Sequence, residues 1–286
     1  MNKIGIVGAS GYAGGNIAKL LQNNNLVEIK IMCSDSLCGK KVSQVFPEVK
    51  TDICFTKIDF NELNKMDLVF LAVPHNTAKP IAENLFTKVI DLSVDHRHTH
   101  TYGLTEIFSD EIKNAKLVAN PGCYATACLL SVWPIKDKIE YLAFDCISGY
   151  SGGGKNNSYD YVENVIAYNL VNHFHKQEIE DKLGFSVSFT PHVVNIFKGL
   201  MCTSHIKLKE EISKKELFKI YNSQYNNSMV KVVEKIPCTK EVINTPYCYI
   251  NFEVNKKELV IISVIDNLLK GAASQAIQNM NLMLGI

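Results

Sequence analysis

The chain has 286 residues, of which 47% are hydrophobic and 21% are charged, a balance typical of a globular protein with one large or two ordinary domains. Its formal net charge is +1, and it has no run of like charges and no basic stripe interleaved with aromatic residues. This pattern excludes a nucleic-acid-binding or membrane-surface protein and favours a small-molecule partner.

Targeting and cysteine patterns point to a cytoplasmic protein. No segment has the pattern of a secretory signal, and none approaches the roughly 18 apolar residues of a membrane span. The nine cysteines are scattered, odd in number and without a C-x-x-C pair. This spacing predicts reduced thiols rather than disulfides, and no metal site.

The first part of the chain alternates between strand-like and helical patterns. Short apolar runs typical of buried strands cover residues 3–8, 27–33, 67–73 and 88–94, and helical spacing covers Tyr12–Leu21 and Thr77–Phe86. Such alternation predicts an α/β domain with a parallel, doubly wound sheet.

After Trp133 longer strands are predicted at residues 139–150, 185–191, 199–208, 247–254 and 258–265, with helices at Asn157–Leu170 and Ser213–Gln224. This pattern predicts an α+β domain on a mainly antiparallel sheet. A last helix is predicted over residues 267–286, where its apolar face must cover another element.

Glycines mark the first strand-to-helix junction. Gly8, Gly11 and Gly14 have the spacing that lets backbone N–H groups and a helix N-terminus approach a pyrophosphate, which predicts a dinucleotide site. After the second strand, Asp35 suits the ribose hydroxyl of NAD, whereas Lys40 and Lys41 suit the phosphate of NADP. The two interpretations conflict.

Cys123 follows Asn-Pro-Gly and precedes a predicted helix over Tyr124–Trp133. A helix N-terminus lowers the pKa of a thiol from its free value of about 8.5, so Cys123 is a candidate nucleophile. Cys128 and Cys146 lie in the middle of predicted elements and read as structural.

A thiolate nucleophile needs a base and a site for the leaving anion. His173 and His175 form a pair that faces one direction if the segment is extended, and Glu178 is placed to orient one of them. The stretch from Ser148 to Lys155, rich in glycine, suits an anion held by backbone amides and an ammonium group.

Several stretches together resemble the N-acetyl-gamma-glutamyl-phosphate reductases of arginine biosynthesis, relatives of the aspartate-semialdehyde dehydrogenases. They are GIVGASGYAG, VFLAVPH, VIDLSVDHR, ANPGCYATA, SGYSGGGK, HFHKQEI, FTPHVV and the C-terminal DNLLKGAASQAIQNMNLMLG. The resemblance implies a Rossmann domain of residues 1–122 and 267–286, and a catalytic and oligomerisation domain of residues 123–266 in a homodimer or homotetramer.

The resemblance also implies a reaction and its residues. Cys123 attacks an acyl phosphate, releases phosphate and forms a thioacyl enzyme that NADPH reduces to the semialdehyde, with His175 as acid/base and His173 as substitute. Cofactor-binding residues are expected at Gly8, Ser10, Gly11, Tyr12, Gly14, Ser34, Lys40, Pro74 and Asn267. Substrate-binding residues are expected at Asn120, Ser148, Ser151, Gly152, Lys155, Glu178 and Lys198.

The chain departs from the family pattern in three places. Phe174 and Gln177 replace a basic residue and a proline of the histidine motif, and Ala125 replaces a proline after Gly-Cys-Tyr. Ser34-Asp35 stands where many relatives have Ser-Arg, which keeps NAD open as the cofactor.

Three alternatives remain open. Two are enzymes, a reductase of carrier-linked aminoadipyl phosphate in lysine biosynthesis and an aspartate-semialdehyde dehydrogenase. The third is an inactive NADP-sensing regulator, although a sensor has no need of an activated thiol.

Overall fold

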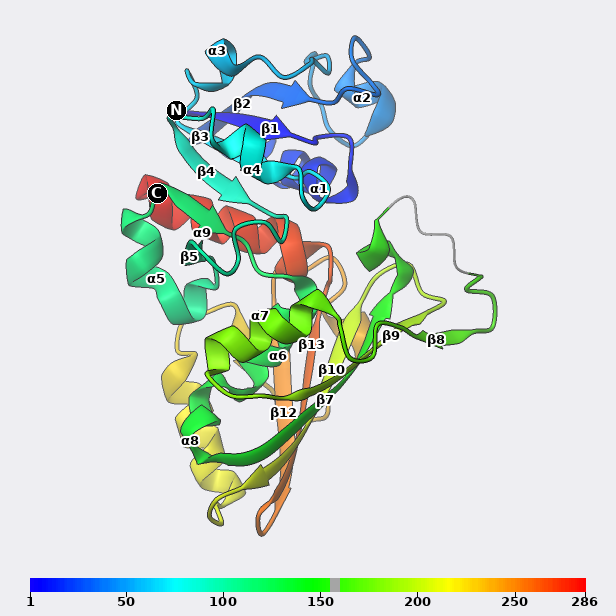
Figure 1. Ribbon diagram of the computed structural model, residues 1–286, viewed down its shortest axis with the longest axis vertical. Helices are drawn as coiled ribbons and strands as arrows, with labels where there is room; N and C mark the ends of the chain where they lie inside the picture. The colour runs from blue at the N-terminus through cyan, green and yellow to red at the C-terminus, as the bar shows by residue number, and fades with distance from the viewer. Residues whose placement is uncertain (155–159) are drawn as a thin grey trace. The chain divides into compact units, whose positions relative to one another are not determined.

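The computed structural model describes residues 1–154 and 160–286 (Figure 1). The chain divides into two compact units, one of Met1–Gly122 with Ala272–Ile286 and one of Cys123–Gly271. The returning C-terminal segment therefore begins at Ala272 rather than at residue 267. Among the described residues no helix has the length and apolar character needed to cross a membrane.

The first unit is built on one parallel sheet of six strands in the order β2-β1-β3-β4-β6-β5. The strands are β1 (Asn2–Val7), β2 (Val27–Cys33), β3 (Leu68–Leu71), β4 (Lys88–Asp91), β5 (Thr101–Tyr102) and β6 (Leu117–Ala119). Every residue of β3 is buried, as expected of a parallel strand covered on both faces. The strand order reverses between β1 and β3, and such a switch point is where open α/β sheets bind ligands.

Helices of the first unit are α1 (Tyr12–Leu21), α2 (Val42–Val45), α3 (Phe60–Leu63), α4 (Ala78–Ala82), α5 (Thr105–Asn114) and α9 (Ser274–Leu284). The range of α1 is the predicted one, whereas α4 ends before the predicted Phe86. The amide N–H of Phe86 donates to the side chain of Asn64 (2.7 Å) instead of continuing a helix. The C-terminal α9 packs against α1, α5 and β4 of this unit.

The second unit holds a mixed sheet, in the described residues seven strands in the order β11-β12-β13-β10-β7-β9-β8. They are β7 (Ile139–Gly149), β8 (Val165–Ala167), β9 (Ser188–Val194), β10 (Leu200–Leu208), β11 (Val230–Val232), β12 (Cys248–Asn255) and β13 (Glu258–Ile265). β7, β10, β13 and β12 pair antiparallel in turn, and only the β7–β9 and β11–β12 pairs are parallel. The predicted fold class is confirmed.

In the described part of this unit three α-helices accompany the sheet: α6 (Cys123–Val132), α7 (Phe174–Leu183) and α8 (Lys214–Gln224). Residues 124–132 of α6 are all buried, because the helix packs against β10, β13 and α7. A helix that is apolar on all sides needs such cover.

One prediction in this unit was wrong, and the condition set for the histidine pair is not met. Residues 160–170 form turns and β8 instead of the predicted helix, and residues 155–159 lie outside the described residues. The histidine segment is helical rather than extended, because the His173 ring caps α7 and Gly184 ends it in a left-handed conformation with φ of 81°.

Candidate active site

The turn between β1 and α1 has the geometry of a pyrophosphate cradle. Gly8 has φ of 76°, and an added Cβ would lie 2.3 Å from the carbonyl oxygen of Ala72. A Cβ added to Gly14 would lie 2.7 Å from Cα of Ala9, so the turn and α1 pack too closely for a side chain there. At Gly11, the N-cap of α1, an added Cβ would meet only the Gly8 oxygen at 3.5 Å among the described residues. The first turn of α1 is therefore open to an anion.

Polar and charged residues follow β2, where the sequence predicted contacts to the ribose of the cofactor. Ser34 is buried and its Oγ donates to Oγ of Ser10 (2.8 Å), which ties the end of β2 to the glycine turn. Asp35 and Lys40 are both exposed beyond it, whereas Lys41 pairs with Asp52 at 3.5 Å. A carboxylate and an ammonium group thus both follow β2.

Three further predicted cofactor residues lie in different places. Pro74 is exposed just beyond the carboxyl end of β3, and its carbonyl accepts the hydroxyl of Thr77 (2.6 Å). Tyr12 begins α1 directly after the glycine turn. Asn267 belongs to the second unit, where its Oδ1 accepts the N–H of Gly199 (2.8 Å) and its Nδ2 donates to Oγ of Ser151 (3.0 Å).

Cys123 is the first residue of α6, at the helix N-terminus that the sequence predicted, and its side chain is only partly buried. The free amide N–H groups and the dipole of a helix N-terminus favour a thiolate. The other end of this unit reaches the same residue, because a Cβ added to Gly271 would lie 2.7 Å from Cβ of Cys123. The backbone at residue 271 can therefore lie this close to Cys123 only because residue 271 is a glycine.

We expect Gly271→Ala to displace Cys123, because two Cβ atoms cannot approach to 2.7 Å. Displacement of a nucleophile by about 1 Å lowers kcat/KM by about 10²-fold. Steady-state kinetics with a parallel measurement of Tm separate this effect from unfolding. Activity within twofold of the wild type would show that the contact does not position the cysteine.

The first turn of α7 meets the first turn of α6 through Tyr124. The ring of Tyr124 lies edge-on to His173 and to His175, with centroids 5.9 and 5.7 Å apart. Its hydroxyl donates to the carbonyl of His192 (2.7 Å), and burial raises its pKa far above the ordinary range, so it stays neutral. The residue next to the candidate nucleophile thus packs directly on both predicted histidines.

The two histidines differ in what their rings do. Nδ1 of His173 accepts the backbone N–H of His175 (3.1 Å) as the N-cap of α7. That role requires an uncharged acceptor nitrogen, and burial lowers the pKa of His173 to about 4. His175 and Glu178 are both buried on the same side of α7, one turn apart. The capping role of His173 leaves His175 as the better candidate for proton transfer.

The lowered pKa of His173 gives a pH dependence of stability. An unfolded histidine titrates near 6.5, so the unfolded chain binds a proton that the folded chain refuses until the pH is about 4. The contribution of His173 to stability is thus complete above pH ~6.5 and is lost as the pH falls from there towards 4. His173→Asn keeps an N-cap acceptor without this titration.

We therefore expect the Tm of His173→Asn to fall less steeply than that of the wild type between pH 6.5 and 4. The matched control is His205→Asn, because the side chain of His205 is 49% exposed. Equal slopes for His173→Asn and the wild type would contradict the assignment.

The glycine-rich loop brings together three of its predicted residues. Ser148 and Ser151 are buried, and a Cβ added to Gly152 would lie 3.2 Å from Oγ of Ser148. Asn267, placed in the cofactor set by the sequence, joins these residues through Ser151. The fourth, Lys155, lies outside the described residues.

Lys198 lies in an internal ion pair. Its Nζ is 3.4 Å from Oδ2 of Asp266 and donates to Oδ1 of Asn244 (2.5 Å). The same carboxylate is fully buried and accepts the backbone N–H groups of Asn244 and Leu268. Any contact of Lys198 with a substrate carboxylate must compete with Asp266.

Asn120, three residues before Cys123, is held in a polar network of the first unit. Its Nδ2 donates to the carbonyl of Ala272 (3.3 Å), and its Oδ1 accepts from Asn279 of α9 (3.0 Å). The buried Arg97 donates Nε to the Asn120 carbonyl (3.0 Å). These contacts fix the backbone that leads to the cysteine.

Sequence reasoning missed several residues of this region. Gly271 and the fully buried Lys270 precede α9 in a stretch predicted as plain helix, whereas residues 269–273 form a π-helical turn. Arg97 ends the VIDLSVDHR stretch between His96 and His98, where its polar neighbours gave no signal that its side chain is buried.

Two family models match the chain. The model of the semialdehyde dehydrogenase NAD binding domain matches residues 3–115, and that of the semialdehyde dehydrogenase dimerisation domain matches residues 123–267. The N-acetyl-gamma-glutamyl-phosphate reductase of Campylobacter jejuni strain RM1221 is 38% identical over 98% of this chain and 95% of its own. The enzyme of the same name from Methanoregula boonei is 39% identical over 99% of this chain and 95% of its own.

Solved structures share the fold at lower identity. Aspartate semialdehyde dehydrogenase II of Vibrio cholerae, complexed with ASA, has a TM-score of 0.83 at 18% identity and covers 100% of this chain and 98% of that one. The enzyme of Candida albicans with NADP has a TM-score of 0.78 at 14% identity, over 99% and 98% of the two chains.

Proposed function

Because the chain belongs to the N-acetyl-gamma-glutamyl-phosphate reductases of the semialdehyde dehydrogenase family, we propose that it reduces N-acetyl-gamma-glutamyl phosphate to N-acetylglutamate semialdehyde in arginine biosynthesis. The reaction releases phosphate and uses NADPH. The observation that carries the proposal is the meeting of Cys123 at the N-terminus of α6 with the histidines of α7 through Tyr124.

Cys123 begins the reaction as a thiolate, which the helix N-terminus favours. Its Sγ attacks the acyl carbon, a C–S bond forms, and the bond from that carbon to the phosphate oxygen breaks. Phosphate is a good leaving group, so the thiolate needs little further activation. The product of this step is a thioacyl enzyme and free phosphate.

His175 is the proposed acid/base residue. It accepts the thiol proton as Cys123 ionises and holds it for the substrate oxygen that becomes negative when the thioester is reduced. The tetrahedral adduct then returns this proton to His175 as its C–S bond breaks, which releases the aldehyde and leaves Cys123 as the thiolate. Glu178 on the same side of α7 is the proposed orienting group. The loop from Ser148 to Gly152 is the proposed site for the anionic group of the substrate, and Lys198 the proposed partner of its carboxylate.

The glycine turn and the first turn of α1 fit a dinucleotide, with Gly8, Ser10, Gly11, Tyr12 and Gly14 around the pyrophosphate. When bound, a reduced nicotinamide supplies the hydride that converts a thioester to an aldehyde. Ser34 and Lys40 are the proposed partners of the phosphate of NADPH, and Asp35 keeps binding of NADH possible.

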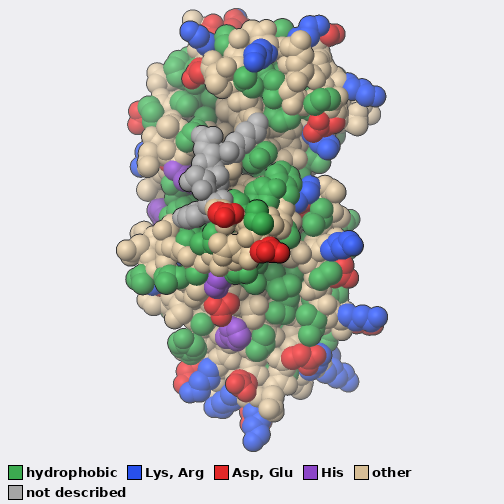
Figure 2. Space-filling model, turned by 90° about the vertical axis from the view of Figure 1, so that its right-hand side faces the viewer, with side chains coloured by type: hydrophobic (Ala, Val, Ile, Leu, Met, Phe, Trp, Pro, Cys, Tyr) green, Lys and Arg blue, Asp and Glu red, His purple; other side chains and the backbone are tan. Residues whose placement is uncertain are grey.

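The second unit carries the features of a subunit interface. The match to a dimerisation domain indicates a homo-oligomer, and we propose a homodimer or homotetramer. Figure 2 shows hydrophobic side chains exposed among the charged ones on one face of the molecule. Exposed apolar residues of this unit include Tyr141, Ile147, Val162, Val165, Leu170, Val171, Ile196 and Phe197.

The reverse reaction tests the proposal. We expect N-acetylglutamate semialdehyde, phosphate and NADP to give the reduced cofactor at a rate that requires all three, and NAD to support a slower rate. Aspartate semialdehyde is the matched alternative substrate. Failure of the acetylated aldehyde to reduce either cofactor would refute the assignment. Faster turnover of aspartate semialdehyde would show that the chain is an aspartate-semialdehyde dehydrogenase instead.

A further inference from the structure

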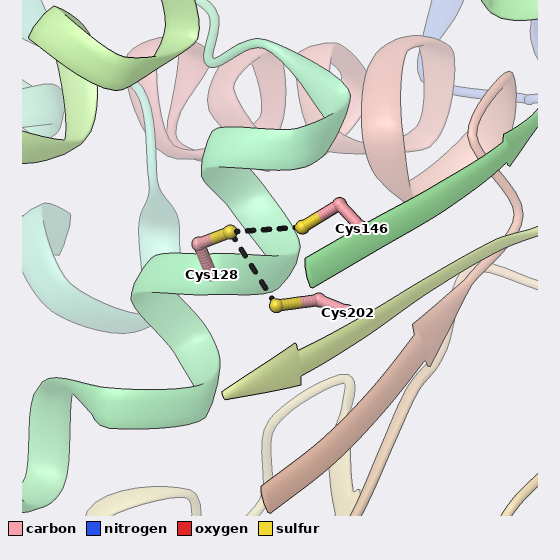
Figure 3. A group of neighbouring side chains, drawn as sticks. All are labelled: Cys128, Cys146 and Cys202. Carbon is pink, nitrogen blue, oxygen red and sulfur yellow. Dashed lines mark hydrogen bonds between the residues drawn. The ribbon is translucent and has the colours of Figure 1, made fainter. Parts of the chain in front are cut away.

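Three sulfur atoms that the proposed reaction does not use meet in the core of the second unit. Cys128 comes from α6, Cys146 from β7 and Cys202 from β10 (Figure 3). Sγ of Cys128 lies 3.6 Å from Sγ of Cys146 and 3.4 Å from Sγ of Cys202, and the three sulfurs all lie within 4.8 Å of one another. All three residues are fully buried.

The spacing of the sulfurs is close to that of a trigonal thiolate site. A metal–sulfur bond of about 2.3 Å places the three sulfurs of a planar site about 4.0 Å apart. The observed contacts of 3.4 and 3.6 Å reach this spacing with shifts of a few tenths of an ångström. A metal would thus fit without a rearrangement of the sheet.

The donor set selects the kind of metal. Structural zinc takes four ligands. Among the described residues this cluster offers three, all of them cysteine sulfurs, and no His, Asp or Glu side chain belongs to it. Sulfur donors without oxygen or nitrogen ligands prefer a soft cation such as Cu⁺. Trigonal coordination by three sulfurs therefore favours copper in its reduced state.

The surroundings of Cys202 supply one further polar contact. Ser204 Oγ lies 3.7 Å from Sγ of Cys202. A hydroxyl at this distance can donate to the sulfur when it binds a cation as a thiolate.

We propose that Cys128, Cys146 and Cys202 form a binding site for a single Cu⁺ ion. Each Cu–S bond to a thiolate replaces an S–H bond, the released proton goes to solvent, and no electron is transferred. Because the sulfurs are buried, the ion enters when α6 opens locally from the sheet. The sequence predicted no metal site, since the three cysteines are far apart in the chain and follow no spacing motif.

The test is an anaerobic titration of the reduced full-length chain with Cu⁺ held by a chelator that reports its free concentration. We expect one ion per chain to be withdrawn from the chelator. Cys202→Ser should weaken this binding by at least about 100-fold. The control combines Cys38→Ser, Cys54→Ser and Cys238→Ser, whose thiols are exposed, and it should bind as the wild type does.

X-ray absorption of the loaded control variant keeps the test decisive if Cys202→Ser does not fold. Three sulfur neighbours at about 2.3 Å from copper support the site. Two sulfurs, or nitrogen neighbours, overturn it, as does the loss of binding in the exposed-thiol control or in Cys123→Ser. Failure to withdraw any copper from the chelator also overturns it, and none of these outcomes bears on the reductase activity.

Discussion

Replacing Cys123 with serine is expected to lower kcat/KM for the acyl phosphate by at least about 10⁴-fold, because removing the nucleophile of a covalent mechanism leaves only binding and electrostatic stabilisation. A serine hydroxyl at the N-terminus of α6 has nearly the same size but is not ionised at neutral pH. The rate of phosphate release and the rate of cofactor oxidation should fall together.

Two controls separate this loss from a structural effect. The affinity for NADPH, measured by its fluorescence, should stay within about twofold, because the glycine turn lies in the first unit and Cys123 in the second. Cys54→Ser replaces an exposed thiol and should keep full activity. Normal activity of Cys123→Ser would rule out a mechanism that proceeds through a thioacyl group on Cys123.

The second large effect is expected at His175. His175→Asn should lower kcat by about 10²- to 10⁴-fold, the usual contribution of a general acid/base group. The matched variant is His173→Asn, because His173 lies two residues away and packs on the same Tyr124 ring. It should keep kcat within about tenfold, since an asparagine side chain also caps a helix.

The pH profile of kcat distinguishes a proton-transfer role from a positioning role for His175. The wild-type profile should show a limb that His175→Asn lacks and His173→Asn retains. A larger loss of kcat in His173→Asn than in His175→Asn would show that His173, and not His175, is the acid/base residue.

Local signals were enough to predict much of the first unit. The ranges of α1 and β2 agree with the sequence, because a glycine turn, an apolar helical face and a short β-rich run each act over few residues. The two-residue β5 carries no such signal. α5 includes the non-helical Phe108, which interrupts the periodicity on which prediction depends.

The histidine segment shows the opposite case. α7 is polar along most of its length, and its start depends on a histidine that accepts a backbone N–H, a less common N-cap than serine or aspartate. Only Gly184, which ends the helix, was a recognisable signal. The sequence therefore left the conformation of this segment open, and the structure shows it to be helical.

Parts of the candidate site depend on contacts between distant positions. Gly271 meets Cys123 from the other end of the second unit, and Asn267 meets Ser151 in the same way. The sequence did predict that Cys123 and the glycine turn lie at the starts of helices, because each has its own local signature. The other residues reach the site through the pairing of strands that are far apart in the chain. A local sequence pattern does not predict this pairing.

The thioacyl enzyme is the intermediate on which the proposed function depends. The most direct test mixes the chain with N-acetyl-gamma-glutamyl phosphate without any nicotinamide cofactor, quenches it in acid and maps the peptides by mass spectrometry. We predict an acyl group on the peptide that contains Cys123 and none in Cys123→Ser. An unmodified Cys123 after phosphate has been released, or an acyl group on another residue, would contradict the account.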